Sequence, residues 1–255
     1  MPDNPRQGQP VWIDYVCQDF DAMKNFYSEV FGWEIVDQGP DFGHYHQAYK
    51  DGAPVGGFMR AMTMDGNPDP TMPTAWSTYL YTSDIDGTFA KATKDGAAPV
   101  VGPMAVGPLG SMAVVVDPTG APIGMWQSDE FTGFELPLVP GTPVWFELMT
   151  TDYDTACEFY VDAFDFQLVE VEGQEIKYAT YGANETAVAG ICDASQWTPN
   201  SYWRTYFNVA DVDAAAAKVV ELGGSVLDGP MDSEFGRVAT VADPEGATFQ
   251  LHQDL

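Results

Sequence analysis

The sequence predicts an α+β fold built from four copies of one βαβββ module. Two observations lead to this prediction. The second half of the chain repeats motifs of the first half in the same order, and each half contains two strand–aspartate–helix segments followed by short β-rich runs. The 255 residues are enough for two homologous halves of ordinary domain size.

The internal repeat is visible in motifs that return in order at a nearly constant spacing. The recurring pairs are Pro10–Trp12 with Pro143–Trp145, Phe26-Tyr27 with Phe159-Tyr160, Trp76–Tyr79 with Trp203–Tyr206, and Asp117–Gly120 with Asp243–Gly246. Ordered matches with a small drift in spacing indicate duplication of one unit followed by loop-length changes. We therefore treat the two halves as copies.

Four helices are expected, each after an aspartate that is suited to cap its first turn. These aspartates are Asp19, Asp84, Asp152 and Asp211. Apolar residues follow Asp19 and Asp152 at the three-to-four spacing of a helix with one buried face. Gly96 and Gly223 are predicted to stop the second and fourth helices.

Short β-rich runs follow each helix and complete the modules. In the first module they cover 33–37, 44–50 and 55–60, separated by glycine and aspartate turns. The predicted modules span 10–61, 75–127, 143–192 and 202–253. The proline-containing stretch 128–142 is the predicted linker, which divides the chain into domains 1–127 and 143–255.

Composition excludes several classes of partner. Ten lysines and arginines against 38 aspartates and glutamates give a net charge of −28, which disfavours nucleic acid and anionic membranes. No apolar run approaches the roughly 20 residues of a membrane-spanning helix, and the N-terminus lacks a signal-peptide pattern. We expect a cytoplasmic monomer or homodimer that binds a small-molecule ligand. Cys17, Cys157 and Cys192 lie far apart and are expected to be buried, unreactive thiols.

The pattern strand–Asp–helix–Phe-Tyr, at Asp19 to Tyr27 and Asp152 to Tyr160, resembles the vicinal-oxygen-chelate superfamily. The Asp-Pro-x-Gly turns before the last strand of the second and fourth modules share this resemblance, which spans residues 10–253. The superfamily includes glyoxalase I, bleomycin-resistance proteins, extradiol dioxygenases and fosfomycin-resistance enzymes. The chain is most similar to tandem actinobacterial-type members labelled glyoxalase-like or hydroxylase. The resemblance implies that two modules pair and curl eight strands into an open cup. The paired modules are neighbours in sequence, or they are exchanged between the halves or between subunits, because both arrangements occur in the superfamily.

The resemblance also implies three metal-ligand positions in each cup, two on first strands and one after the Asp-Pro-x-Gly turn. In this sequence those positions hold Trp12, Ser77 and Gly124 in the first half, and Trp145, Arg204 and Gln250 in the second. None is the histidine, carboxylate or thiolate that zinc, nickel or iron requires, and arginine repels a cation. We therefore predict no metal at the usual position and no cofactor.

Strand alternation predicts which side chains face each cup, because successive residues of a strand point to opposite faces. The N-terminal cup is expected to contain Trp12, Asp14, Ser77, Tyr79 and Trp126. The C-terminal cup is expected to contain Trp145, Glu147, Arg204, Tyr206, Gln250 and His252. The aromatic N-terminal set suits stacking on a flat ligand, or else the rings simply fill the interior.

In the C-terminal cup, Glu147 and Arg204 either hold a ligand carboxylate, act with His252 in acid–base chemistry, or form a structural ion pair. We expect Arg204 to be the main electrostatic contact for an anionic or carbonyl-bearing ligand. The N-terminal cup, with Ser77 and Gly124, is expected to be roomier. His44 and His46 are interpreted as a chance polar pair on an exposed edge.

Three functions remain open at this stage. The favoured one is a metal-independent binding protein of the sequestering or resistance kind, because the ligand positions are lost and the cups are aromatic. The second is a metal-free isomerase or lyase that uses Glu147, Arg204 and His252 on a small carbonyl or anionic metabolite. The third is a metalloenzyme, a lyase or dioxygenase, with its site moved to Asp14 or Glu147 plus His252.

Overall fold

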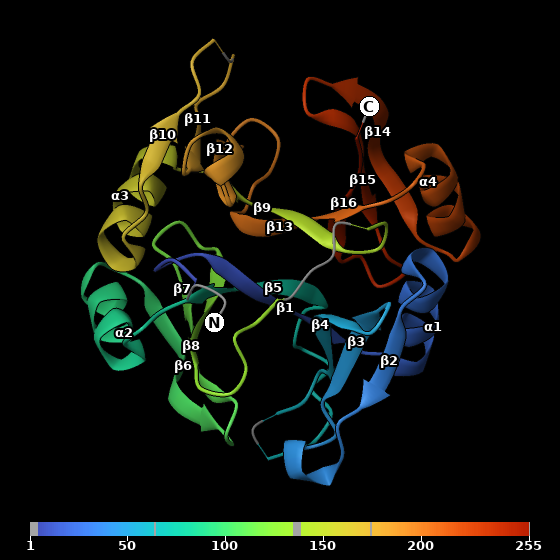
Figure 1. Cartoon of the computed structure of the whole chain (residues 1–255), viewed down its shortest axis with the longest axis horizontal. Helices are drawn as coiled ribbons and strands as arrows, with labels where there is room; N and C mark the ends of the chain where they lie inside the picture. The colour runs from blue at the N-terminus through green and yellow to red at the C-terminus, as the bar shows by residue number, and fades with distance from the viewer. Residues whose placement is uncertain (1–4, 64, 135–138, 174, 255) are drawn as a thin grey trace. The chain divides into compact units, whose positions relative to one another are not determined.

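The computed structural model of the chain describes residues 5–63, 65–134, 139–173 and 175–254 (Figure 1). In these residues four βαβββ modules follow one another, which confirms the predicted α+β fold. The first module comprises β1 (Pro10–Cys17), α1 (Phe20–Phe31), β2 (Glu34–Asp37), the short helix η1 (Pro40–Phe42), β3 (His46–Lys50) and β4 (Ala53–Arg60). The second comprises β5 (Ala75–Tyr81), α2 (Ile85–Lys94), β6 (Ala98–Val106), β7 (Gly110–Val116) and β8 (Pro122–Ser128).

The second half repeats this order of elements. The third module comprises β9 (Pro143–Thr150), α3 (Tyr153–Phe164), β10 (Leu168–Glu170), β11 (Tyr178–Tyr181), the short helix η2 (Asn184–Thr186) and β12 (Ala189–Asp193). The fourth comprises β13 (Tyr202–Asn208), α4 (Val212–Glu221), β14 (Ser225–Ser233), β15 (Gly236–Ala242) and β16 (Thr248–Gln253). No helix in the described parts of the chain combines the length and the apolar character needed to cross a membrane.

The strands form two eight-stranded mixed sheets, one from each half. Their orders are β2-β3-β4-β1-β5-β8-β7-β6 and β10-β11-β12-β9-β13-β16-β15-β14. In every module the first strand pairs in parallel with the last, as β1 does with β4 and β9 with β12. Each parallel pair needs the long crossover that the helix provides, which explains why a helix follows every first strand.

Aspartate caps start all four of these helices, as the sequence predicts. The side chains of Asp19, Asp84, Asp152 and Asp211 accept hydrogen bonds from backbone N–H groups three residues further on, at 2.9–3.2 Å. Each such cap stabilises its helix by about 1 kcal/mol. Gly96 and Gly223, the predicted stops, follow α2 and α4 with φ of 101° and 91°.

The chain divides into two compact units, and each unit combines modules from both halves. Unit 1 comprises residues 1–12, 77–133 and 145–204, in which α2 packs with α3. Unit 2 comprises residues 13–76, 134–144 and 205–255, in which α1 packs with α4. Part of the predicted linker, 135–138, lies outside the described residues.

Candidate ligand-binding site on the second half

Strand β9 presents two faces of different character. Phe146 and Leu148 are buried at 7% and 0% exposure, as expected for core positions. On the alternate face, Trp145 is half-buried and Glu147 is 5% exposed. Side chains two residues apart on a strand lie on the same side. Trp145 and Glu147 therefore belong to one surface, as the sequence predicts.

Glu147 forms an ion pair with Arg204 from β13. Arg204 Nη2 lies 2.6 Å from Glu147 Oε2, and the two side chains are 13% and 7% exposed. A guanidinium–carboxylate hydrogen bond of this length is short and charge-assisted. The cost of removing both charges from water offsets most of the favourable free energy of their attraction. The predicted proximity of the two residues is present, and the pair as a whole is electrically neutral.

Strand β12 pairs with β9 beside Glu147 and carries the thiol of Cys192, while a tyrosine hydroxyl from β11 approaches the same strand. Gly190 lies opposite Glu147 in the register, and a Cβ at Gly190 would collide with Tyr178 Oη. Glycine at this position therefore lets the tyrosine hydroxyl approach the strand. Burial and the Glu147 carboxylate raise the pKa of the Cys192 thiol to about 12. Because the thiolate is the reactive form, Cys192 is not a nucleophile at neutral pH.

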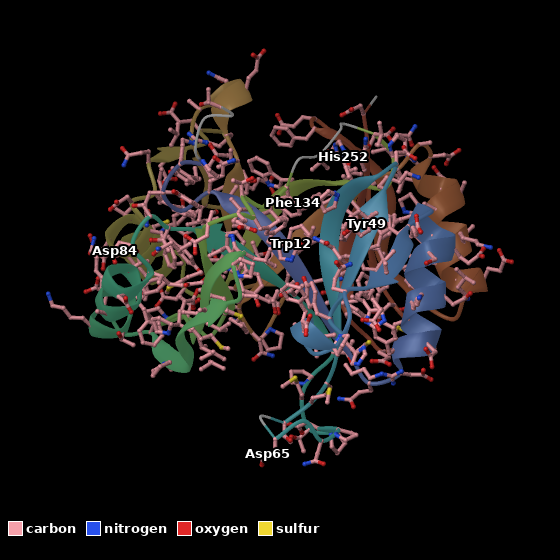
Figure 2. All side chains as sticks on the ribbon, turned by 60° about the horizontal axis from the view of Figure 1, so that its bottom comes forward. Trp12, Tyr49, Asp65, Asp84, Phe134 and His252 are labelled. Carbon is pink, nitrogen blue, oxygen red and sulfur yellow. The ribbon has the colours of Figure 1, made fainter. Side chains whose placement is uncertain are left out.

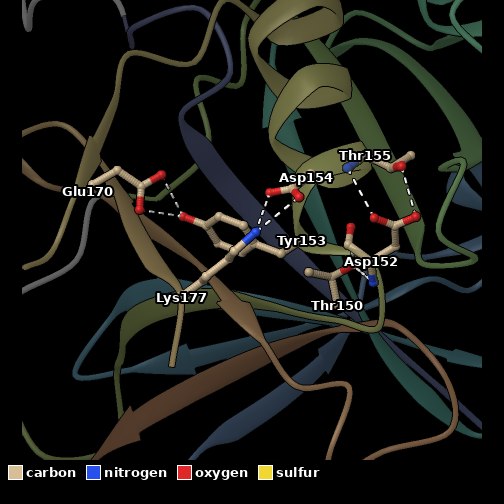
Figure 3. A network of polar contacts seen from close by, with 7 residues as sticks. All are labelled: Thr150, Asp152, Tyr153, Asp154, Thr155, Glu170 and Lys177. Atoms are coloured by element: carbon tan, nitrogen blue, oxygen red, sulfur yellow. Dashed lines mark hydrogen bonds and ion pairs between the residues drawn. The ribbon is translucent and has the colours of Figure 1, made fainter. Parts of the chain in front are cut away.

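A polar network fixes the start of α3, directly after β9 (Figure 3). Tyr153 Oη donates to both carboxylate oxygens of Glu170 at 2.9 Å, and Lys177 Nζ lies 2.7 Å from Asp154. Asp152 caps the helix through Thr155 N and Thr155 Oγ1. These contacts tie β10 and the residue before β11 to the first turn of α3.

The matching face of the first half is closed by the chain itself. Trp12 (labelled in Figure 2) is 6% exposed, and the Phe131 ring lies edge-on to it at 4.9 Å between centroids. Trp126 Nε1 donates to the Phe131 carbonyl at 2.9 Å. A Cβ at Gly124 would collide with the Tyr79 ring. The expectation of extra room at Gly124 is therefore wrong, because the tyrosine ring occupies that space.

Four further predicted residues lie in unit 2. Asp14 is 6% exposed and accepts a hydrogen bond from Tyr45 Oη at 2.6 Å. Gln250 Oε1 accepts from Thr240 Oγ1 at 2.7 Å, and Tyr206 is its register partner. His252 Nε2 lies 2.7 Å from the Phe235 carbonyl. Glu147 and Arg204 belong to unit 1, so the predicted acid–base set is divided between the units.

The donor set does not fit the metal site that the family resemblance implies. Tyr79 covers Gly124, Arg204 is a cation already paired with Glu147, and Gln250 offers an amide oxygen bound to Thr240. Divalent transition metals need histidine, carboxylate or thiolate ligands in one cluster. Within residues 5–63, 65–134, 139–173 and 175–254, no three such side chains are grouped to hold a metal ion.

Sequence reasoning missed two features of the structure. One is Phe131, which was treated only as part of a linker. The other is a buried chain of hydrogen bonds in each unit, from a tryptophan to a helix tyrosine to the aspartate of an Asp-Pro-x-Gly turn. The signal was available, because all three residues recur in both halves, as Trp76 with Trp203, Tyr27 with Tyr160 and Asp117 with Asp243.

One family model matches both halves of the chain. The family model described as Glyoxalase/Bleomycin resistance protein/Dioxygenase superfamily matches residues 9–125 and 142–251. The protein CFP32 of Mycobacterium bovis, which carries a glyoxylase name, is 34% identical over 96% of this chain and 95% of its own length. The anthracycline biosynthesis protein DauV of a Streptomyces species is 33% identical over 96% of this chain and 92% of its own.

Solved structures share the fold at lower sequence identity. The Mn(II)-bound glyoxalase of Novosphingobium aromaticivorans aligns with a TM-score of 0.66 and 17% identity, covering 98% of this chain and 83% of that one. The trihydroxybiphenyl dioxygenase of Sphingomonas wittichii aligns with a TM-score of 0.64 and 16% identity, covering 96% and 90%. The predicted family resemblance is confirmed.

Proposed function

This chain belongs to the glyoxalase/bleomycin resistance protein/dioxygenase superfamily, and from that premise we propose that it binds a small, flat, oxygen-bearing organic molecule against β9. The proposed site consists of Trp145, Glu147 and Arg204, and it works without the superfamily's usual metal. Binding, rather than a specified reaction, is the function that these residues support.

The observation that carries the proposal is an ion pair between Glu147 and Arg204 beside the half-buried Trp145 on the same strand face as Glu147. An indole ring provides a stacking surface, while Arg204 donates hydrogen bonds and Glu147 accepts them. Binding sites for small molecules commonly combine aromatic surface with a few placed polar groups. This combination is present on β9 and β13.

Neutrality of the pair narrows the ligand class. A simple anion would be attracted by Arg204 but repelled by Glu147 at short range. A ligand with a carbonyl and a neighbouring hydroxyl uses both partners, because the carbonyl accepts from arginine and the hydroxyl donates to glutamate. We therefore favour hydroxy-carbonyl aromatic compounds over plain carboxylates. The relatives named for anthracycline biosynthesis, at 33% and 32% identity, support this class, since anthracyclines are polycyclic hydroxyquinones.

The test is a calorimetric titration with a dihydroxyanthraquinone sulfonate, with a chelator present to exclude adventitious metal. The matching anthraquinone sulfonate without hydroxyls is the second probe, because it keeps the ring and the charge. A hydrogen bond to a charged group contributes about 1.5–3 kcal/mol, which is about tenfold to a hundredfold in Kd. We expect Glu147→Gln to weaken the hydroxylated probe by about tenfold and to leave the other probe unchanged or tighter.

Two further variants complete this test. Trp145→Leu should weaken both probes, because it removes the stacking surface. Arg237→Gln is the control, since Arg237 forms ion pairs with Asp213 and Asp232 on unit 2 and lies outside the proposed site. Equal affinity for the hydroxylated probe in wild type, Glu147→Gln and Trp145→Leu would rule out this site.

A further inference from the structure

The two halves place a tryptophan at the same position, but the one in the first half is more deeply buried. Trp12 and Trp145 both end a Pro-Val-Trp motif near the start of the first strand of their half. Trp12 is 6% exposed, whereas Trp145 is half-buried. Among the ring contacts of the described residues, none involves Trp145.

A residue of the chain's own linker packs directly on Trp12. The Phe131 ring meets Trp12 edge-on, with 4.9 Å between centroids and 89° between planes, and it lies 6.0 Å from Trp126. Edge-to-face contacts of this kind are a preferred geometry of aromatic pairs. Trp126 Nε1 also donates to the Phe131 carbonyl at 2.9 Å. One residue thus supplies both a ring and an oxygen acceptor.

The linker is held in this position from both sides of Phe131. The backbone N–H groups of Asp129 and Phe131 donate to the Leu109 carbonyl, both at 3.0 Å. Gly133 has φ of 100°, and a Cβ there would collide with Val11. Only glycine adopts this conformation without strain and also passes so close to β1. Backbone hydrogen bonds and close packing of the linker therefore fix the position of Phe131.

We propose that Phe131 acts as an internal ligand that occupies an aromatic binding site formed by Trp12 and Trp126. The concealed site has the chemistry of a receptor for a flat ring that carries an oxygen acceptor, with the ring against Trp12 and the oxygen on Trp126 Nε1. The ligand class rests on the proposed function, but the concealment rests on the contacts of Phe131 alone. The first half is closed by its own linker, and the second half keeps its tryptophan available.

The experiment measures how many probe molecules bind per chain. Wild type should bind one dihydroxyanthraquinone sulfonate, and Phe131→Ala should bind two, because removing the ring uncovers Trp12. Phe131→Ala combined with Trp12→Leu should return to one. Thr132→Ala is the control for disturbance of the same loop and should bind one. Phe131→Val is a milder second variant that keeps an apolar side chain, and far-ultraviolet circular dichroism verifies folding of each protein.

The outcomes separate this inference from the proposed function. A Phe131→Ala protein that is folded and gains no site dependent on Trp12 overturns the inference, even where the second half binds as proposed. Wild type without binding, together with a Trp12-dependent site in Phe131→Ala, supports the inference and contradicts the proposed function. Acrylamide quenching of tryptophan fluorescence gives an independent readout. It should increase in Phe131→Val relative to wild type, and this increase should vanish when Trp12→Phe is added.

Discussion

The two compact units keep the same buried hydrogen-bond chain. In unit 2, Trp76 Nε1 donates to Tyr27 Oη at 3.0 Å, and Tyr27 donates to Asp243 at 2.8 Å. In unit 1, the matching chain runs from Trp203 through Tyr160 to Asp117, at 2.8 and 2.9 Å. A buried carboxylate must be hydrogen-bonded to be tolerated. Both compact units have therefore retained the hydrogen bonds that satisfy this aspartate.

The strand faces, by contrast, have diverged at matched positions. Two residues after the matched tryptophan, the first half has Asp14, which accepts a hydrogen bond from a tyrosine. The second half has Glu147 at this position, and it forms an ion pair with Arg204. The position that holds Arg204 holds Ser77 in the first half. The comparison indicates that the interior network maintains the fold, while the faces were free to acquire different chemistry.

The largest expected effect concerns the ion pair that only the second half has. Arg204→Ala leaves Glu147 buried without its cation and should lower the free energy of unfolding by about 3–5 kcal/mol. Ser77→Ala, at the matched position, should cost less than about 1 kcal/mol. Urea unfolding followed by circular dichroism measures both. Similar losses of unfolding free energy for the two variants would show that the ion pair contributes no more to stability than Ser77 does.

The second prediction uses the difference between the two hydrogen-bond chains. Asp243 Oδ2 accepts from Tyr15 as well as Tyr27, whereas leucine, Leu148, stands at the position of Tyr15 in the repeat. Tyr27→Phe leaves the Asp243 carboxylate a second phenol, so a loss of about 1 kcal/mol is expected. Tyr160→Phe removes the phenol that donates to Asp117 Oδ2. This variant should lower the free energy of unfolding by about 2–3 kcal/mol. The reverse order in thermal or urea unfolding would contradict this account.

The smallest effect is a pH dependence that arises from Asp243 in unit 2. Burial raises the pKa of Asp243, and hydrogen bonds from Tyr15 and Tyr27 lower it in part. A carboxyl group with a raised pKa contributes stability below its unfolded pKa, and this is lost as pH rises through the folded value. Tyr15→Phe raises the pKa further, so its destabilisation should be larger at neutral pH than near pH ~4. Equal losses at both pH values would show that Asp243 does not titrate with this bond.

Much of the fold follows from local sequence signals. The aspartate caps, the glycine stops and the repeated strand patterns act over a few residues, so Asp19 or Gly96 can be interpreted without knowledge of distant contacts. Strand alternation likewise placed Trp145 and Glu147 on one face. Matching the first strands of two modules placed Glu147 and Arg204 on one cup face, where an ion pair between them was one of three alternatives.

The rest depends on contacts between residues far apart in sequence. The recurrence of Tyr160 and Asp117 marks them as a repeated feature, but sequence alone does not show that they contact each other, or that units combine modules across halves. Nor does it show that Phe131 turns back onto Trp12, because an aromatic residue in a proline-containing linker has no periodic pattern to reveal its partner. Tyr79 fills the space over Gly124 for the same reason: side-chain direction is set by packing.

A crystal structure of the protein with the dihydroxyanthraquinone sulfonate bound would show directly whether the ligand lies on β9. We expect the ring system to lie against Trp145, with a ring carbonyl within hydrogen-bond distance of Arg204, while Phe131 remains in contact with Trp12. A ring system bound away from Trp145, with the Glu147–Arg204 pair making no contact to it, would contradict the claim.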